Sequence, residues 1–359
     1  MPEGPEIHIA ARFINQVSDK HEFGGPIKKS AVSTKNPDVE FKAKSYNIRA
    51  EARGKELKVF LEDKNSADKK THILFRFGMS GCFNFTSEDD LPKHAHLMFS
   101  TVGEKTRQVL SFVDYRRFGR WELEADWGKD RGPDPMFEYE EFRQNILDNL
   151  EAAAFNKPIC ETMLNQKYFN GIGNYLRAEI LFRSQIKPFT KASDVLEPLI
   201  VKQEVEDKKP DVLDLCSIIP KEVLSLNKGK NYNPDSEQSD KSFSEWLQCY
   251  YVDGMNNLQD GHGRTIWFSG DPGPMVPRNA KVVGRKGGTG SKVPQSGVKK
   301  EEKEEKVKVK SVKRKVKEES SKAKKTKKDP ESKPVKEEKI KVEKEEKSTR
   351  KSKRRKNKK

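Results

Sequence analysis

The chain has 359 residues and a formal net charge of +16 at pH 7. Residues 278–359 contain 34 Lys and Arg against 13 Asp and Glu, whereas residues 1–277 contain 38 against 43. The basic charge therefore belongs to the C-terminal segment. It does not by itself indicate that the preceding part, which is long enough for two domains, binds nucleic acid.

The cysteines and the hydropathy pattern exclude several classes of protein. Cys82, Cys160, Cys216 and Cys249 are widely spaced, and without a Cys-x-x-Cys pair we expect no structural zinc site. So few cysteines suit a reducing compartment. No apolar run is long enough to span a bilayer, and acidic residues stand where a signal peptide carries basic ones, so we expect neither a membrane protein nor a secreted one.

The first six residues, Met1-Pro-Glu-Gly-Pro-Glu6, combine a nucleophile with two acids. If Met1 is removed, as a small second residue generally permits, Pro2 becomes a secondary amine that can form a Schiff base with a carbonyl. An α-amino group titrates at roughly 7.7–8.0, against about 10.4 for lysine, so far more of it is neutral at pH 7. Glu3 and Glu6 are candidates for proton transfer. The same residues also suit an ordinary helix start.

A helix is expected over residues 5–17, because apolar residues recur there near a 3.6-residue period. The apolar face consists of Ile7, Ala10, Phe13, Ile14 and Val17. We expect this face to pack on a sheet and so to hold the N-terminus in place. His8 is interpreted as a packing or capping histidine rather than a catalytic one.

Residues 27–123 are predicted to be rich in β-strands. Runs of β-branched, aliphatic or aromatic residues lie at Leu57–Leu61, His72–Met79, Ala95–Ser100, Gln108–Val113 and Arg120–Leu123. The run from Ile73 to Phe77 is mostly apolar, as expected of a strand buried between two layers. The pattern predicts a two-layer β-sandwich or flattened barrel with the first helix against it.

Turn-forming residues at Gly128–Pro135 indicate a linker, after which the pattern becomes helical. Helices are expected at Phe142–Leu150, Pro158–Asn165, Asn174–Ser184, Ala192–Val205, Val212–Leu215, Pro220–Leu226 and Ser242–Tyr250. Residues 227–241 are polar and are predicted to form a mobile loop, and Gly261–Phe268 is predicted to form a small hairpin. The fold class is therefore α+β.

Residues 278–359 have no aromatic residue, few aliphatic residues and dense Lys, Glu and Ser, so this tail cannot bury a core and is predicted to be disordered. It ends in Lys351–Lys359, a basic run typical of a nuclear address or a nonspecific DNA tether. A purely solubilising tail explains the same composition. Any DNA binding through the tail should weaken steeply with salt.

Two glycine-containing turns are candidates for phosphate binding. In Asn170-Gly-Ile-Gly-Asn174 the glycines allow a close backbone approach, and amides at the start of the following helix can bind a phosphate. In Gly261–Phe268, Arg264 lies in a glycine-flanked turn that can direct its guanidinium at a phosphate. A tight interhelical turn and an ordinary turn arginine are the structural alternatives.

Three further turns carry cations beside glycines. Phe75–Gly81 and Asp114–Arg120 mix bulky apolar groups with arginines, as do loops that wedge into a base stack after a nucleotide is extruded. Arg53-Gly-Lys-Glu56 offers Lys55 on a turn. Taken alone, each of them is better explained as a loop that carries surface charge.

Six motifs occur together in one order: Pro-Glu at the N-terminus, Arg-Gly-Lys, Phe-Gly-Met-Ser-Gly, Asp-Tyr-Arg-Arg-Phe-Gly-Arg, Asn-Gly-Ile-Gly-Asn-Tyr-Leu-Arg-Ala-Glu and Gly-Arg-Thr-Ile-Trp-Phe. In this order the chain resembles the formamidopyrimidine-DNA glycosylase/endonuclease VIII family, most closely its vertebrate zincless-finger branch. The resemblance covers residues 1 to about 277. Two departures from the wider family are Gly4 in place of a leucine common in bacterial members and the absence of a four-cysteine zinc finger.

The resemblance implies domains at 1–130 (β-sandwich with leading helix), 131–241 (helical, with a helix-two-turn-helix motif and a lesion loop), 242–277 (zincless β-hairpin finger) and 278–359 (disordered tail). It also implies that no metal and no cofactor are needed.

The resemblance assigns catalytic roles to four residues. Pro2 would attack C1′ of the damaged nucleotide, displace the base and form the Schiff base. Glu3 would handle protons at the sugar, with assistance from Glu6. Lys55 would lie near the sugar and phosphate of the lesion and help elimination.

The resemblance likewise assigns DNA contacts. Asn174 and Arg264 would bind phosphates flanking the extruded nucleotide, and Lys230 would touch the flipped base. Three side chains would fill the gap left in the duplex: Met79, Arg116 and Phe118.

The implied function is that of a nuclear, bifunctional DNA glycosylase/AP lyase of base excision repair that removes oxidised pyrimidines and ring-opened purines. Its expected partners are damaged DNA, whether duplex, single-stranded or in open structures, and replication and repair proteins through the tail. We expect a monomer without membrane contact. Two alternatives remain: a noncatalytic binder of damaged DNA, which would need neither Pro2 nor Glu3, and an architectural chromatin protein led by its tail.

Overall fold

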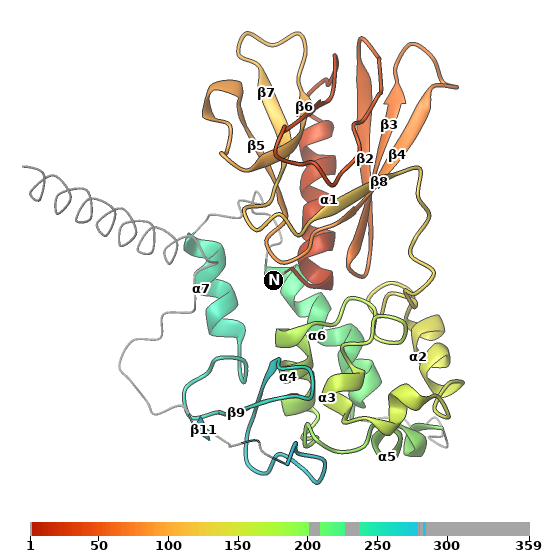
Figure 1. Ribbon diagram of the computed structural model, residues 1–359, viewed down its shortest axis with the longest axis vertical. Coiled ribbons are helices and arrows are strands. Elements are labelled where there is room, and N and C mark those ends of the chain that lie inside the picture. Colours follow the sequence, from red (N-terminus) through yellow and green to blue (C-terminus); the bar gives the residue numbers. More distant parts are fainter. Residues whose placement is uncertain (1, 201–208, 227–236, 279, 281–282, 285–359) are drawn as a thin grey trace, which may run out of the picture. The chain divides into compact units, whose positions relative to one another are not determined.

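The computed structural model describes residues 2–200, 209–226, 237–278, 280 and 283–284 (Figure 1). The helices are α1 (Gly4–Ser18), α2 (Tyr139–Leu147), α3 (Ile159–Thr162), α4 (Asn174–Arg183), α5 (Ala192–Leu196), α6 (Val212–Leu226) and α7 (Glu237–Trp246). The strands are β1 (Lys28–Lys29), β2 (Tyr46–Arg53), β3 (Glu56–Asp63), β4 (Lys70–Arg76), β5 (Cys82–Ser87), β6 (Ala95–Ser100), β7 (Gln108–Val113), β8 (Arg120–Leu123), β9 (Asn256–Gln259), β10 (Thr265–Phe268) and β11 (Val283–Gly284).

Two antiparallel four-stranded sheets follow α1, in the orders β1-β6-β7-β5 and β2-β3-β4-β8. Side chains from both sheets and from α1 share one apolar core. The α+β class, with N-terminal β-sheets and a leading helix, is confirmed. β2 and β3 pair without a break from Tyr46–Asp63 to Arg53–Glu56, so the two-residue turn between them carries Lys55 at its tip.

Helix α1 is held against the first strand of its sheet by hydrogen bonds as well as by apolar packing. The amide of Asn15 donates to the carbonyl of Ala50 at 3.0 Å and accepts from the N–H of Ala50 at 2.7 Å. The hydroxyl of Ser18 accepts from the N–H of Ile48 at 3.2 Å. The predicted packing of this helix on a sheet is therefore confirmed, and it fixes the N-terminal turn in space.

The second apolar core joins the helices to the β9–β10 hairpin. Phe169, Leu176, Ile180 and Leu213 are fully buried in it, and so is Ile266 of the hairpin. The hairpin is thus attached to α4 by its own apolar side chains. Among the described residues, no helix is both long and apolar enough to cross a membrane.

Several predicted boundaries are corrected by the structure. β1, β2 and β5 were not expected. In β2, side chains alternate between buried and exposed, but Asn, Arg, Ala and Glu have low intrinsic strand preference, and pairing with β3 overrides it. The two short helices predicted on either side of Pro220 are one helix, α6. Pro220 and neighbours such as Ile219 and Val223 are buried, so packing offsets the lost backbone hydrogen bond.

Some expectations lie outside the described residues. The predicted loop at 227–241 is described only from 237 onward, where α7 begins. Of the predicted tail at 278–359, only 278, 280 and the two residues of β11 are described. The helix predicted at Ala192–Val205 is shorter: α5 is followed by a 3-10 turn at Glu197–Leu199.

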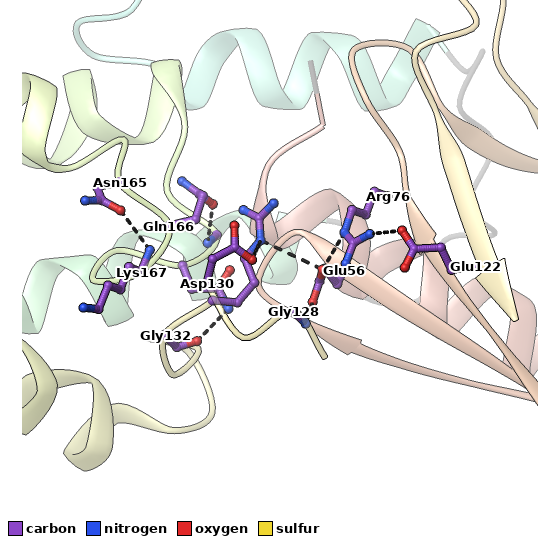
Figure 2. A network of polar contacts seen from close by, with 12 residues as sticks. Glu56, Arg76, Glu122, Gly128, Asp130, Gly132, Asn165, Gln166 and Lys167 are labelled. Atoms are coloured by element: carbon purple, nitrogen blue, oxygen red, sulfur yellow. Dashed lines mark hydrogen bonds and ion pairs between the residues drawn. The ribbon is translucent and has the colours of Figure 1, made fainter. Parts of the chain in front are cut away.

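A polar network fastens the linker that follows β8 (Figure 2). The buried carboxylate of Glu56 accepts from Arg76 Nε at 2.7 Å and from the N–H of Gly128 at 2.9 Å. Arg76 also donates to the exposed Glu122. Further along, the N–H of Gly132 donates to the carbonyl of Gln166 at 2.9 Å. The linker is therefore held at both ends.

Replacing Glu56 by alanine should lower the free energy of unfolding by about 2–3 kcal/mol, because it leaves the partly buried N–H of Gly128 without its acceptor and removes the buried partner of Arg76. Urea unfolding of the full chain measures this. Glu122→Ala is the matched control: it removes the half-exposed partner of the same Arg76 and should cost less than about 1 kcal/mol. Equal losses in the two variants would contradict a structural role for the buried carboxylate.

Candidate active site

The N-terminal turn meets the first turn of α4. The Glu3 carboxylate is 1% exposed and accepts from the N–H groups of Tyr175 at 3.0 Å and Leu176 at 3.2 Å. These amides are otherwise unpaired at a helix start, and the positive end of the helix dipole favours the anion. Partly buried Pro2 directly precedes Glu3. The amides that sequence analysis assigned to a phosphate are therefore in part occupied by Glu3.

Glycines permit this close approach. Gly171 has φ +94°, and its carbonyl accepts from the N–H of Gly4 at 2.8 Å. A Cβ on Gly171 would lie 3.4 Å from Gly54 Cα and 3.5 Å from Gly4 Cα. A Cβ on Gly173 would come within 2.2 Å of Glu3 Cδ. At Gly171 the left-handed backbone is what favours glycine, whereas at Gly173 a side chain would collide with Glu3.

The Lys55 side chain also reaches the turn before α4, near Glu3. Its Nζ donates to the carbonyl of Ile172 at 2.6 Å. Burial lowers the pKa of Lys55 to about 8, although the Glu3 carboxylate opposes this. Burial also raises the pKa of Glu3, against the attraction of Lys55 and the two amide hydrogen bonds. Both groups are therefore shifted toward the range in which proton transfer at neutral pH is efficient.

Glu6 forms the opposite side of this cluster. Its carboxylate accepts from the N–H of Glu3 at 2.8 Å and from the Tyr175 hydroxyl at 2.9 Å. Burial, and then the like charge of Glu3, raise the pKa of Glu6 to about 7. Three of the four catalytic candidates, Glu3, Glu6 and Lys55, are thus brought together with Pro2 alongside.

Asp134 links the helix behind Pro2 to the turn that carries Lys55. Its Oδ2 lies 2.7 Å from His8 Nε2 on α1 and accepts from the N–H of Gly54 at 2.7 Å. Burial opposes ionisation, but the bonds from His8 and from the amides of Gly54 and Met136 lower the pKa of Asp134. His8 is therefore a packed partner of a buried carboxylate.

The two candidate phosphate ligands lie on adjoining elements. Asn174 begins α4, and its Nδ2 donates to the carbonyl of Thr265 on β10 at 2.9 Å. Arg264 is exposed and directly precedes Thr265, at the turn between β9 and β10.

The three candidate wedge residues project from two loops that Asp114 joins. Buried Asp114 accepts from the Ser80 hydroxyl and from the N–H groups of Arg116 at 3.2 Å and Gly119 at 2.6 Å. Arg116 Nη1 lies 3.5 Å from Met79 Sδ. Met79 is 42% exposed and Phe118 58%. Arg116 and Met79 are therefore close together, and all three side chains are exposed.

Two remaining expectations concern Lys230 and metal. Lys230 lies outside the described residues. Within the described part of the chain, no group of three or more His, Cys, Asp or Glu residues is arranged to hold a metal ion.

The sequence matches two family models and several known proteins. Residues 1–121 match the family model described as formamidopyrimidine-DNA glycosylase N-terminal domain, and residues 241–277 match the one described as endonuclease VIII-like 1, DNA bind. Over 296 residues the chain is 49% identical to endonuclease 8-like 1 of Homo sapiens, covering 78% of this chain and 75% of that protein. The Mus musculus protein of the same name is 48% identical over 301 residues, covering 80% and 77%.

The chain belongs to the formamidopyrimidine-DNA glycosylase/endonuclease VIII family. It is accordingly an enzyme with DNA glycosylase and AP lyase activity, of the base excision repair class.

Solved structures of the family share the fold. The Lactococcus lactis formamidopyrimidine-DNA glycosylase, in a complex with DNA containing an oxidised pyrimidine, has a TM-score of 0.55 at 20% identity and covers 74% of this chain and 97% of that one. The Thermus thermophilus enzyme has a TM-score of 0.54 at 20% identity and covers 75% and 97%. At this identity the likeness concerns the fold.

Three residues that organise the site were not predicted from the sequence. They are Asp134, Tyr175 and the buried Arg177, whose Nη2 donates to Asn174 Oδ1 at 2.7 Å. Each acts across a long stretch of sequence, as when the Tyr175 hydroxyl reaches Glu6. Tyr175 and Arg177 do lie inside the quoted Asn-Tyr-Leu-Arg-Ala-Glu motif, so that motif was the available signal.

The raised pKa of Glu6 has a consequence for stability. A carboxyl whose pKa is higher in the folded state stabilises that state through its proton. The contribution is fully present below pH 4.5, the pKa of the group in the unfolded chain, and is lost as the pH rises through about 7, its pKa in the folded state. Relative to Glu6→Gln, the free energy of unfolding of the wild type should therefore fall by up to about 3 kcal/mol as the pH rises from 4.5 to about 7. Urea unfolding at several pH values measures it, with exposed Glu40→Gln as control. A difference that stays constant with pH would contradict the assignment.

Proposed function

We propose that this chain removes oxidised pyrimidines and ring-opened purines from DNA by covalent catalysis at the amine of Pro2. The observation that carries the proposal is the buried Glu3 carboxylate, fixed on the start of α4 beside Lys55 and directly after Pro2. A protein that only bound DNA would have no use for two buried groups with shifted pKa values next to its N-terminal amine.

The chemistry proceeds in two stages. The lone pair of the Pro2 nitrogen forms a bond to C1′ as the bond from C1′ to the base breaks, and the base leaves with a proton. The nitrogen then loses its proton, and its lone pair forms a double bond to C1′ as the C1′–O4′ bond breaks and O4′ takes up a proton. The iminium formed in this way withdraws electrons, so a base can remove a proton from C2′. The electron pair then expels the 3′ phosphate, which cuts the strand. Glu3 is placed for the proton transfers at the sugar, and Glu6 assists it.

Lys55, Asn174 and Arg264 position the sugar and its phosphates. With its pKa lowered to about 8, Lys55 keeps a proton over most of the neutral range and can neutralise the leaving phosphate. Asn174 and Arg264 bind the flanking phosphates, and Lys230 contacts the extruded base. Extrusion costs roughly a few kcal/mol, less at a damaged pair. Insertion of Met79, Arg116 and Phe118 into the gap offsets this cost.

The same proposal includes the setting of the enzyme. It acts as a monomer in the nucleus, on damaged duplex or single strands, and the β9–β10 hairpin works as a zincless finger. The basic tail supports the nuclear address and contacts with replication and repair proteins.

Borohydride reduction with lesion-bearing DNA should trap a covalent complex, and mass spectrometry should place the link on Pro2. A Pro2→Glu variant, whose larger second residue retains Met1, should give no trapped product and no cleavage. It should still bind DNA that carries an uncleavable abasic-site analogue, because the phosphate ligands are unchanged. Wild type is the control for both measurements. Full cleavage by protein whose amine is blocked would overturn the proposal.

The wedge assignment predicts a difference between substrates. Phe118→Ala should lower kcat/KM on a duplex lesion on the order of tenfold, because an unfilled gap must otherwise collapse. It should have little effect on the same lesion in a single strand, where there is no duplex gap. Ile200→Ala, which also truncates an exposed apolar side chain, is the control and should leave both substrates unaffected. Equal loss on both substrates would count against the wedge.

A further inference from the structure

A buried arginine connects the two candidate phosphate ligands. Arg177 lies on α4, three residues after Asn174. Its Nη1 donates to the carbonyl of Cys160 at 2.7 Å and to Asp260 Oδ2 at 2.8 Å, and its Nη2 donates to Asn174 Oδ1 at 2.7 Å. The side chains of Arg177 and Asp260 are both 0% exposed. One guanidinium thus ties α3, the start of α4 and the end of β9 together.

The second oxygen of Asp260 shapes the turn that carries Arg264. Asp260 Oδ1 accepts from the N–H groups of His262 and Arg264, each at 2.9 Å. The N–H of Asp260 donates back to the carbonyl of Arg264 at 2.9 Å, which closes the turn. Asp260, which is itself held by Arg177, therefore fixes the backbone position of Arg264.

Arg177 also restrains the orientation of the Asn174 amide. A guanidinium only donates, so the atom opposite Nη2 must be the amide oxygen. With Oδ1 engaged by Arg177, one N–H of Nδ2 goes to the carbonyl of Thr265. The Tyr250 hydroxyl is a further hydrogen-bond partner of the Asn174 side chain. Arg177, Thr265 and Tyr250 together hold the amide in one orientation, and removal of Arg177 would leave Asn174 Oδ1 without its donor.

We propose that the Arg177–Asp260 pair is a positioning device that aligns Asn174 and Arg264 for the same stretch of DNA backbone. The inference rests on the proposed function, in which those two residues bind phosphates. Arg177 is fully buried and so acts through them. A buried ion pair adds little net stability over apolar replacements, which are often neutral or stabilising. Its value here is that it fixes two ligands on separate elements at once.

Salt dependence separates this role from a structural one. Binding of the full chain to a duplex with an uncleavable abasic-site analogue is measured across a range of salt. Arg264→Ala should reduce the slope of log affinity against log salt by about 1, because one phosphate contact is lost. Arg177→Met should give the same reduction, with affinity lower on the order of tenfold. The double variant should have the slope of Arg264→Ala alone.

A loss of fold stability alone leaves the slope unchanged. Arg143→Met, which breaks the ion pair with Asp211 at 3.0 Å in the helical part, should lower Tm and keep the wild-type slope. Arg177→Met combined with Asp260→Asn leaves no unpaired buried charge, keeps an oxygen for the turn amides and should still show the reduced slope. A wild-type slope in the Arg177 variants, or effects of Arg177→Met and Arg264→Ala that add in full, would overturn the proposal. Failure of the borohydride trap would instead reject the covalent mechanism.

Discussion

The contact of the Glu3 carboxylate with the first amides of α4 is the constraint on which the site depends. It joins residues 172 positions apart in the chain and joins the core of the β-sheets to the core of the helices at the same point. The helix start supplies N–H groups that need an acceptor, and the N-terminal turn supplies the anion. Because Glu3 is next in sequence to Pro2, this contact also limits where the proposed nucleophile can lie.

The charges gathered there are costly to bury, and the surrounding geometry limits the cost. Glu3 is compensated by two amides and by Lys55, and Glu6 by the hydroxyl of Tyr175. The compensation is incomplete, so the pKa values of the carboxyls rise and that of Lys55 falls. Burial is thus the largest cause of all three pKa shifts. Networks such as the one around Glu56 hold the linker between the two parts (Figure 2).

Sequence patterns predicted the elements whose stability is local. Helix α1, with its regular apolar face, and strands such as β6 and β7 were found within a residue or two. β2 and β5 were missed, because their stability comes from pairing rather than from composition. In the site, Pro2 and Glu3 were candidates from residue type, whereas Lys55 was assigned a role by the family resemblance. The acceptors and anchors, Asp134 and Arg177 above all, were not, because a buried hydrogen bond between distant segments leaves no periodic signal.

The bonds from α1 to β2 have a consequence for solubility. β2 is the outermost strand of its sheet, and such strands expose N–H and C=O groups that can recruit a strand from another molecule. Asn15 and Ser18 cover that margin at Ala50 and Ile48. The helix that follows the proposed nucleophile therefore also covers this edge of the sheet. A change that detaches α1 from β2 would therefore disturb the proposed active site and would also expose the edge of β2 to pairing with another molecule.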